Sequence, residues 1–374
     1  MHMTQYEFRK KLNVENICED LIIRLKSEQL PLIMWGCGDV ADAVFKYLQY
    51  NNINISQVWV DNWSGKQKFH GLIPNSIEAI SKEFHEFNVI LGHSHYEKGK
   101  KIKEFYPQIK NVFYVFIVHY EQYKKISYNE IEEVEERFIQ LYDCLADNDS
   151  RENLLVFLKT KLTGNADYII NRFSQEMSFF NNDVFTMTDH EVFLDIGAYN
   201  GDTIREFIVE TDNKYEKIIA IEPDIKNYIE LNKYLASNCL KNIIPSMIGA
   251  WNCIEQLSFN TGNEQISSIA VDSKILLNSE KLIVYASPID NIFGEEKITF
   301  IKINYFEGVK EALEGLEKII CKNLPKLAVT VGFDIYNILK ISEYIIKLNI
   351  GYKVYLRFNR AMSSTFTLYA IVPN

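Results

Sequence analysis

A glycine-punctuated turn near the middle of the chain is the first place where the residue types suggest chemistry. The apolar run Val192–Ile196 contains Asp195 and leads directly into Gly197 and Ala198, with Gly201 three residues further on. Glycines at such a turn let the backbone approach a bound ligand, and a carboxylate at the end of a strand can reach a cationic or hydroxyl group. These residues therefore form a candidate small-molecule site.

A second acidic residue follows at the separation that a nucleoside site requires. Glu222 comes after the next apolar run, 21 residues beyond Gly201, where an acid can accept hydrogen bonds from a ribose diol. The turn has the spacing Asp-x-Gly-x-x-x-Gly, which is not the dinucleotide fingerprint, and no Lys-Ser/Thr pair follows it. S-adenosylmethionine therefore fits better than NAD or a P-loop nucleotide. The competing interpretation is an ordinary glycine-rich turn in an α/β sheet.

A separate glycine turn lies in the N-terminal third of the chain. Gly36, Gly38 and Ala41 follow an apolar run with the spacing Gly-x-Gly-x-x-Ala, and Asp61 comes 23 residues after Gly38. This pattern matches the fingerprint of a dinucleotide or nucleotide-sugar site. The alternative is a scaffold domain that holds no cofactor.

The histidines and cysteines predict neither a metal site nor disulfides. His93 and His95 lie close together after an apolar run, but no zinc ligand set is recognisable around them, and we expect solvated or hydrogen-bonded imidazoles. The six cysteines contain no CxxC pair, which favours reduced thiols and a cytoplasmic protein.

Length and charge exclude several classes of protein. At roughly 100 to 200 residues per domain, 374 residues correspond to two domains. Forty Lys and Arg against fifty Asp and Glu leave a net charge of −10, which disfavours a broad nucleic-acid surface. The most apolar run, Val112–Val118, is too short to span a membrane, and Met1–Lys11 lacks a signal-peptide core. We expect no nucleic-acid partner and no membrane insertion.

The elements that position these turns alternate between apolar runs and helical segments, which predicts an α/β fold with two Rossmann-like domains. Residues 1–125 form the first domain, whose strands are expected at Leu30–Gly36, Gln57–Asp61, Asn88–Gly92 and Val112–Val118. Residues 126–185 are predicted to be a helical connector. Apolar residues recur there every three or four positions from Ile131 to Leu145, and Asp149 is expected to begin the next helix.

The second domain, residues 186–374, is predicted to contain a seven-stranded sheet of the methyltransferase type. Its strands are expected at Val192–Ile196, Lys217–Ile221, Ile243–Ile248, Thr299–Ile303, Leu327–Val331, Lys353–Phe358 and Thr365–Val372. Only a short stretch separates the last two strands, too short for a crossover helix. They must therefore pair as an antiparallel hairpin at the end of a parallel sheet.

Residues 150–374 resemble the FkbM-type S-adenosylmethionine-dependent methyltransferases, particularly members with an additional N-terminal domain found among glycan-modifying genes. The matching segments are Glu191–Thr203, Ile221–Asp224, Pro288–Asp290, Tyr355–Arg357 and Leu368–Ala370. The resemblance implies an enzyme that uses S-adenosylmethionine and no metal. It also implies that the methyl group goes to an oxygen of a sugar or other small metabolite of polysaccharide biosynthesis.

The resemblance also implies roles for individual residues. Asp195, Gly197, Ala198 and Gly201 would line the methionine end of the cofactor, and Glu222 would hold the ribose hydroxyls. Two further residues would lie near the adenine, namely Ala250 and Trp251. A core aromatic is the competing role for Trp251.

The fourth strand of the predicted methyltransferase sheet departs from the family pattern Lys-Ile-Asp-x-Glu-Gly-x-Glu. Lys302–Val309 stands in its place, so the Asp becomes Asn304 and both Glu positions become apolar. A one-residue slip restores Glu307 before a glycine. Lys302, Asn304 and Glu307 are the candidate catalytic residues on the acceptor side. Near the end of the chain, the usual Arg-His is Arg357-Phe358.

These changes leave two alternatives to an active methyltransferase. Methyl transfer to a hydroxyl needs in-line placement and a route for the proton, so the loss of a carboxylate removes a candidate base. The chain could therefore be a catalytically degenerate binding protein that retains the nucleoside pocket. Alternatively, the N-terminal domain could be the active unit, acting on a nucleotide-sugar or NAD. The sequence does not indicate an oligomeric state.

Overall fold

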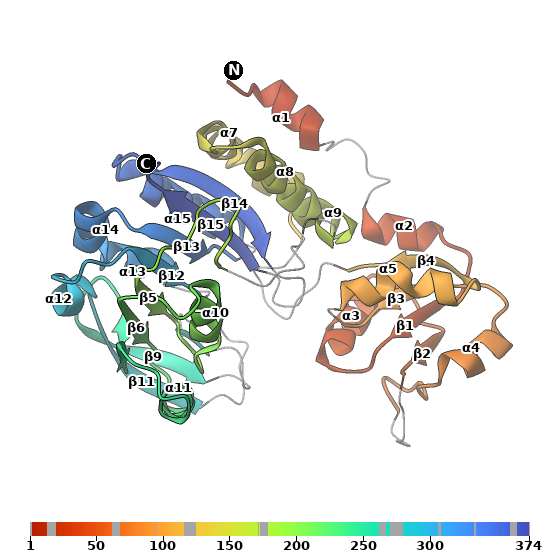
Figure 1. Ribbon diagram of the computed structural model, residues 1–374. Helices are drawn as coiled ribbons and strands as arrows, with labels where there is room; N and C mark the ends of the chain where they lie inside the picture. The colour runs from red at the N-terminus through yellow and green to blue at the C-terminus, as the bar shows by residue number, and fades with distance from the viewer. Residues whose placement is uncertain are drawn as a thin grey trace.

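The computed structural model describes residues 2–12, 20–61, 68–93, 95–115, 125–170, 172, 179–261, 267–269, 280–305, 308–332, 334–359 and 365–373. They form an N-terminal α/β domain and a C-terminal α/β domain, with a group of helices between them (Figure 1). None of the helices in these ranges combines the length and the apolar character that a membrane crossing demands.

Four parallel strands form the N-terminal sheet in the order β2-β1-β3-β4. They are β1 (Leu32–Trp35), β2 (Gln57–Trp59), β3 (Phe87–Leu91) and β4 (Ile109–Phe113). β1 and β3 are buried along their whole length, as expected for central strands covered on both faces. The predicted parallel sheet is confirmed. β4 begins three residues before the predicted Val112, and the predicted strand residues 116–118 lie outside the described ranges.

Helices cover both faces of this sheet. They are α2 (Leu21–Ser27), α3 (Asp39–Tyr50), α4 (Ile77–Glu83) and α5 (Tyr96–Phe105). α2 and α3 pack with Met34 and Ile90 on one face, whereas α4 and α5 pack with Ile33 and Val89 on the other. This is the two-sided layering of a Rossmann-like domain.

The described part of the connector contains the helices α6 (Tyr128–Glu132), α7 (Glu135–Cys144), α8 (Asn148–Thr163) and α9 (Asp167–Ile170). The single amphipathic helix predicted over 131–145 is therefore divided, because the chain turns at Glu133 and Val134. α8 also begins earlier than predicted: Asp147 is its N-cap and accepts a hydrogen bond from the backbone N–H of Ser150. An N-cap acid satisfies a helix N–H in this way, which Asp149, inside the helix, does not do.

The first helix, α1 (Gln5–Leu12), lies beside the connector and not beside the N-terminal sheet (Figure 1). Arg9 in α1 donates to both carboxylate oxygens of Glu135 in α7, each at 2.8 Å. Glu135 is almost fully buried. This ion pair therefore joins α1 to the connector, although the predicted first domain, residues 1–125, includes α1.

The C-terminal domain is built on a seven-stranded sheet with the order β14-β15-β13-β12-β5-β6-β7. The strands are β5 (Val192–Ile196), β6 (Lys217–Ile221), β7 (Ile243–Ser246), β12 (Phe300–Ile303), β13 (Lys326–Thr330), β14 (Lys353–Asn359) and β15 (Thr365–Ile371). β15 is antiparallel to both of its neighbours, and the other pairs are parallel. The seven predicted strands and the terminal hairpin are confirmed.

Helices cover this sheet on both faces as well. α10 (Asp202–Glu210) and α11 (Ile225–Ser237) pack on one face. α13 (Val309–Glu314), α14 (Glu317–Asn323) and α15 (Ile335–Lys347) pack on the other, and the short α12 (Asp290–Phe293) precedes β12. Because β5, β6, β12, β13 and β14 run in the same direction, their carboxyl ends share one edge of the sheet, where ligands of such folds bind.

The sequence reasoning missed a second, small sheet inserted between β7 and β12. Its strands are β8 (Gly249–Ala250), β9 (Glu255–Thr261), β10 (Ser267–Ile269) and β11 (Glu280–Ser287), in the order β10-β9-β11-β8. In β11, Val284 and Ala286 are buried while Ile283 and Tyr285 are exposed. Apolar residues on both faces hide the period-two pattern that normally indicates such a strand.

Candidate cofactor and acceptor site

The glycine turn after β5 lies against the end of β12. Gly197 has φ 77° and Gly201 has φ 85°, values that favour glycine. A Cβ atom on Gly197 would lie 2.6 Å from the carbonyl oxygen of Asn304, so any other residue there would collide with the backbone. On the opposite side, the N–H groups of Gly197 and Ala198 both donate to the carbonyl of Ile221 at 3.0 Å. The turn is thus fixed between the ends of β6 and β12.

Beneath the turn, Asp195 and Lys302 form a buried ion pair across β5 and β12. The Lys302 ammonium donates to Oδ1 of Asp195 at 2.7 Å and to the carbonyl of Gly197 at 2.8 Å, and neither side chain is exposed. Burial raises the pKa of Asp195, and the nearby Lys302 opposes that rise. Oδ2 of Asp195 is buried and has no hydrogen-bond partner among the described residues. An unpartnered buried carboxylate oxygen suits a cationic ligand group.

Lys302 was predicted on the acceptor side, but its ammonium is directed at the glycine turn after β5. Its two hydrogen bonds go to Asp195 and to Gly197, and the Phe179 ring centroid lies 5.5 Å away. An action of Lys302 on an acceptor stays a prediction. The hydrogen bonds of Lys302 support a structural role, in which this side chain holds the glycine turn after β5 against β12.

Glu222 follows β6 and lies at the same edge of the sheet. Its carboxylate accepts hydrogen bonds from the backbone N–H groups of Tyr199 at 2.8 Å and Asp224 at 2.9 Å. Only 5% of the residue is exposed. Burial raises the pKa of Glu222 to about 7, against the lowering effect of the two backbone donors. The Asn227 side chain also hydrogen-bonds to this carboxylate and lowers its pKa. A carboxylate has about four acceptor positions, so the group could still accept from a hydroxyl.

The residues predicted near the adenine lie in the small sheet. Ala250 is buried and pairs in register with Ser287, and the N–H of Trp251 donates to the carbonyl of Ser287 at 3.2 Å. The Trp251 side chain is half-buried and is not part of the buried apolar clusters. The competing role of a core aromatic is therefore not supported, while a contact of Trp251 with adenine stays a prediction.

On the acceptor side, Asn304 comes directly after β12 and is half-buried. The hydroxyl of Thr330, at the end of β13, donates to Oδ1 of Asn304 at 2.9 Å. Phe306 and the candidate Glu307 lie outside the described residues. Gly308 has φ 84° and precedes α13. The structure thus brings Asn304 to the glycine turn after β5. It also adds Thr330, which the sequence reasoning missed because this residue ends an apolar strand and belongs to no recognisable motif.

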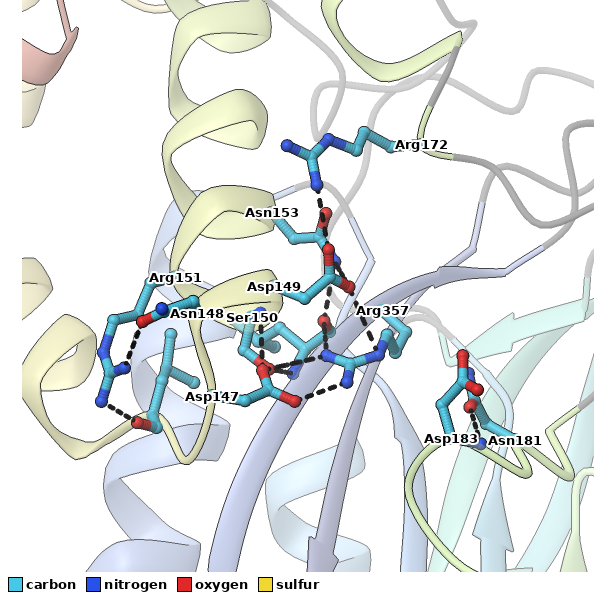
Figure 2. Close-up of polar contacts among 12 residues, drawn as sticks. Asp147, Asn148, Asp149, Ser150, Arg151, Asn153, Arg172, Asn181, Asp183 and Arg357 are labelled. Carbon is cyan, nitrogen blue, oxygen red and sulfur yellow. Dashed lines mark hydrogen bonds and ion pairs between the residues drawn. The ribbon is translucent and has the colours of Figure 1, made fainter.

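Arg357 lies near the carboxyl end of β14, where it joins the sheet to α8 (Figure 2). Its guanidinium donates to Asp147 at 2.6 Å and to the Ser150 hydroxyl at 2.8 Å, and its Nε lies 3.5 Å from Asp149. Burial opposes ionisation of Asp147, but the hydrogen bonds from Arg357 and Ser150 outweigh it and lower the pKa of Asp147 to about 2. Arg357 therefore holds the connector on the sheet, and its nitrogens are occupied by these partners.

The N-terminal glycine turn, Gly36 to Ala41, follows β1. In the sheet, β2 lies on one side of β1 and β3 on the other, so the direction in which strands are added reverses at this turn. A Cβ on Gly36 would lie 2.9 Å from the carbonyl oxygen of Gly92, whereas a Cβ on Gly38 would meet nothing within 4 Å. Gly38 is the N-cap of α3 and provides no side-chain cap. Asp61 lies close by and accepts a hydrogen bond from the Trp35 indole at 3.1 Å.

The two histidines after β3 do not gather metal ligands. The ring nitrogen Nδ1 of His93 accepts a hydrogen bond from the backbone N–H of His95 at 3.2 Å, and burial lowers the pKa of His93 to about 4. Across the described residues, no group of three or more His, Cys, Asp or Glu side chains could hold a metal ion. Hydrogen-bonded imidazoles were predicted, and His93 is one.

The sheet order, the glycine turn and the acid after β6 together define a methyltransferase-type Rossmann domain. The solved structure of the methyltransferase FkbM from Methylobacillus flagellatus KT aligns with this chain at a TM-score of 0.72 and 18% identity, covering 98% of each chain. The resemblance inferred from the motifs is therefore confirmed at the level of the fold, and it extends through the N-terminal domain. Comparison of the sequence with protein-family models and with curated proteins finds no match.

Other solved structures align with about half of the chain. They include an rRNA methylase from Streptococcus thermophilus (TM-score 0.32, 15% identity, 50% of this chain and 90% of that one). Another is a putative methyltransferase from Streptococcus mutans in complex with SAH (TM-score 0.33, 13% identity, 52% and 93%). At these TM-scores the likeness carries no further conclusion.

Proposed function

We propose that the C-terminal domain binds S-adenosylmethionine and transfers its methyl group to an oxygen of a sugar or other glycan-pathway metabolite. The observation that supports this most is the position of Asp195 and Glu222. They lie at the carboxyl ends of adjacent strands β5 and β6, with the glycine turn between them. This is the edge at which doubly wound sheets bind nucleoside ligands.

The residues fit the two polar ends of this cofactor. Oδ2 of Asp195 is buried and finds no partner in the part of the chain that the structure describes, so it would accept from the ammonium of the methionine part. The Glu222 carboxylate is fixed by two backbone N–H groups and would accept from the ribose hydroxyls. Gly197 and Gly201 let the turn pack closely against Asn304 and Tyr234, where an added Cβ atom would lie 2.6 and 3.0 Å away, respectively. When bound, the cofactor supplies an electrophilic methyl carbon on a sulfonium.

The acceptor, the partners and the location in the cell are proposed from the sequence. A sugar or glycan acceptor follows from the motif resemblance alone. A net charge of −10 argues against nucleic acid as a partner, and the five cysteines in the described part form no disulfide, in keeping with a cytoplasmic protein.

Calorimetric titration of the full chain tests the cofactor assignment. We expect S-adenosylhomocysteine to bind with one site per chain, and a Gly197→Ala variant to lose that site because the added Cβ collides with Asn304. Titration with NAD and nucleotide-sugars serves as the comparison. Absence of S-adenosylhomocysteine binding by a folded wild-type protein would refute the proposal. Binding without methyl transfer to any acceptor would support the alternative of a catalytically degenerate binding protein.

A second candidate function belongs to the N-terminal domain, and the open space at Gly38 favours it. The first turn of α3 has no side-chain cap, so its N–H groups are available to a phosphate oxygen. Asp61 stands after the neighbouring strand, where a ribose would be held. We propose a nucleotide-sugar or dinucleotide as the ligand class, against the alternative of a scaffold domain.

A further inference from the structure

Glu222 holds together two segments that meet at the candidate cofactor site. Its Oε2 accepts from the backbone N–H of Tyr199 in the glycine turn after β5 at 2.8 Å, and its Oε1 accepts from the backbone N–H of Asp224 at 2.9 Å. The side chain of Asn227 in α11 donates a third hydrogen bond. The backbone N–H of Glu222 itself donates to the carbonyl of Ser246, at the end of β7. The carboxylate therefore joins the turn after β5 to the start of α11.

Tyr199 depends on this partner because its backbone is left-handed. Its φ is 49°, in a region that residues other than glycine rarely adopt. A conformation of this kind persists only where the surrounding contacts impose it. The neighbouring N–H groups of Gly197 and Ala198 are fixed by the carbonyl of Ile221, and the N–H of Tyr199 is fixed by Glu222. Glu222 thus stabilises the shape of the turn as well as facing the ligand.

The three donors leave little acceptor capacity on the Glu222 carboxylate. An ionised carboxylate has about four acceptor positions, so about one position remains for a hydroxyl of the ribose. A proton on the carboxylate would occupy that position. A hydroxyl that donates to an ionised carboxylate forms a charge-assisted hydrogen bond, which is roughly twice as strong as the bond between two neutral groups. The proton and the ribose therefore compete for Glu222.

The surroundings of Glu222 favour the proton in the free protein. Only 5% of the residue is exposed. Burial raises the pKa of Glu222 to about 7, and the charge of Asp224 adds to the rise. Asp224 is the N-cap of α11 and accepts from the backbone N–H groups of Lys226 and Asn227. The free carboxyl group is therefore about half protonated near pH 7.

The other elements around Glu222 bring further titratable groups to this edge of the sheet. On β5, Asp195 pairs with the ammonium of Lys302 from β12. The turn carries the phenol of Tyr199, α10 begins with Asp202, and β7 ends in an uncharged serine. Negative charges on the two aspartates favour the protonated form of Glu222, and the Lys302 ammonium offsets that of Asp195.

We propose that binding of the cofactor releases a proton from Glu222, because the ionised carboxylate both holds Tyr199 in its left-handed conformation and accepts from the ribose. The inference rests on the proposed binding of S-adenosylmethionine and couples that binding to pH. The released proton passes to the solvent, and no covalent bond of the cofactor forms or breaks. Affinity for the cofactor therefore rises as the pH rises through about 7.

Calorimetric titration of the full chain with S-adenosylhomocysteine tests this coupling without any substitution. Titrations near pH 7 in phosphate and in Tris, which differ in their heats of ionisation, count the released protons, because each proton adds the heat of its buffer to the observed enthalpy. We expect about half a proton per site near pH 7. We also expect a Kd roughly 10-fold weaker at about pH 6 than at about pH 8, since the competent, ionised fraction falls by that factor. A constant Kd without proton release would overturn the inference.

Glu222→Gln identifies the group that releases the proton. Glutamine keeps the size of the side chain but has no proton to lose in this range, so we expect weaker binding with the same Kd at about pH 6 and about pH 8. Glu230→Gln, which changes an exposed acid on α11, is the matched control and should keep the full wild-type dependence. Proton release that survives in Glu222→Gln would assign the coupling to another group and overturn the inference.

Tyr199→Asn tests whether Glu222 holds the turn. Asparagine adopts left-handed backbone conformations more readily than tyrosine does, so the turn of this variant would depend less on the hydrogen bond to Glu222. We expect the loss of affinity caused by Glu222→Gln to be at least about 2-fold smaller in the Tyr199→Asn background than in the wild-type background. Equal losses in the two backgrounds would overturn the role of Glu222 in holding Tyr199.

Failure of the coupling is distinguishable from failure of the proposed function. If the folded wild type binds S-adenosylhomocysteine with a Kd that does not change with pH, the cofactor assignment stands and the release of a proton is overturned. If the folded wild type binds no S-adenosylhomocysteine at either pH, the proposed function is refuted together with the inference that rests on it.

Discussion

The ammonium nitrogen of Lys302 lies 2.7 Å from Oδ1 of Asp195, and the two residues are register partners on β12 and β5. Both side chains are fully buried. Because Lys302 also donates to the carbonyl of Gly197, one side chain fixes both the acid and the turn of the candidate cofactor site. Stability and ligand binding should therefore depend on the same ion pair.

Replacement of Lys302 by methionine tests this dependence. The Asp195 carboxylate would remain buried without its partner, so we expect Lys302→Met to lower the free energy of unfolding by ~3 to 5 kcal/mol. Urea unfolding followed by circular dichroism measures it. Lys217→Met is the control, since Lys217 pairs with Glu296 at a partly exposed position and should cost under ~1 kcal/mol. Equal effects of the two substitutions would contradict a structural role for the buried pair.

Glu222→Ala should weaken binding of S-adenosylhomocysteine. A ribose diol that loses its acceptor inside the pocket leaves hydroxyls unsatisfied, at a cost of ~1 to 3 kcal/mol, which corresponds to roughly 5- to 150-fold in Kd. Calorimetric titration measures the change. Glu230→Ala, which removes an exposed acid on α11, should leave the Kd unaltered. Unchanged affinity in a folded Glu222→Ala variant would remove Glu222 from the cofactor site.

The raised pKa of Glu222 predicts a dependence of stability on pH. Its pKa is about 7 in the folded protein against an ordinary value of 4.5, so the folded state binds this proton more tightly than the unfolded chain does. The stabilisation is fully present below about pH 4.5 and is lost as the pH rises through about 7, by about 3 kcal/mol. Glu222→Gln should lack this slope in chemical unfolding measured from about pH 4 to 8. A wild-type curve that rises over this interval relative to the variant would contradict the assignment.

The strands of the C-terminal sheet could be predicted because each is a short and largely apolar run, as in Val192–Ile196. The stretch between the last two runs is too short for a crossover helix, so those two strands had to form a hairpin. The small sheet could not be predicted, because the exposed face of β11 carries the apolar residues Ile283 and Tyr285 and the strand therefore lacks an alternation of polar and apolar residues. The amphipathic pattern from residue 131 onward is continuous across Glu133 and Val134, so nothing in its period predicts the turn between α6 and α7.

Individual site residues were predictable where a local pattern surrounds them and unpredictable where they depend on pairing. Gly197 and Glu222 stand in short, ordered motifs. The partner of Lys302 is 107 positions away in the sequence, and only the register of β5 against β12 brings it there. The orientation of the Asn304 amide depends in the same way on Thr330, which belongs to another strand.

Arg357 and Asp147 predict the opposite pH behaviour from Glu222. The pKa of Asp147 is about 2 against an ordinary 3.8, so its contribution to stability is present above about pH 4 and is lost as the pH falls through about 2. Arg357→Met should lower the melting temperature at neutral pH and flatten the acid side of the stability curve. Arg137→Met, which removes an exposed pair with Glu343, should do neither. An acid limb as steep in Arg357→Met as in the wild type would contradict the pairing.

Gly38 offers a test of the N-terminal domain that does not disturb its fold. Its φ is −87° and an added Cβ would meet nothing within 4 Å, so Gly38→Leu should fold normally, with at most about 1 kcal/mol lost at the helix N-cap. The new side chain would cover the N–H groups at the start of α3. We expect nucleotide-sugar binding, followed by calorimetry, to disappear in this variant while affinity for S-adenosylhomocysteine stays constant. Two outcomes would favour the scaffold alternative. One is equal nucleotide-sugar binding by the variant and the wild type. The other is no binding by the wild type at roughly millimolar ligand, a concentration that detects even a binding free energy of only about 4 kcal/mol.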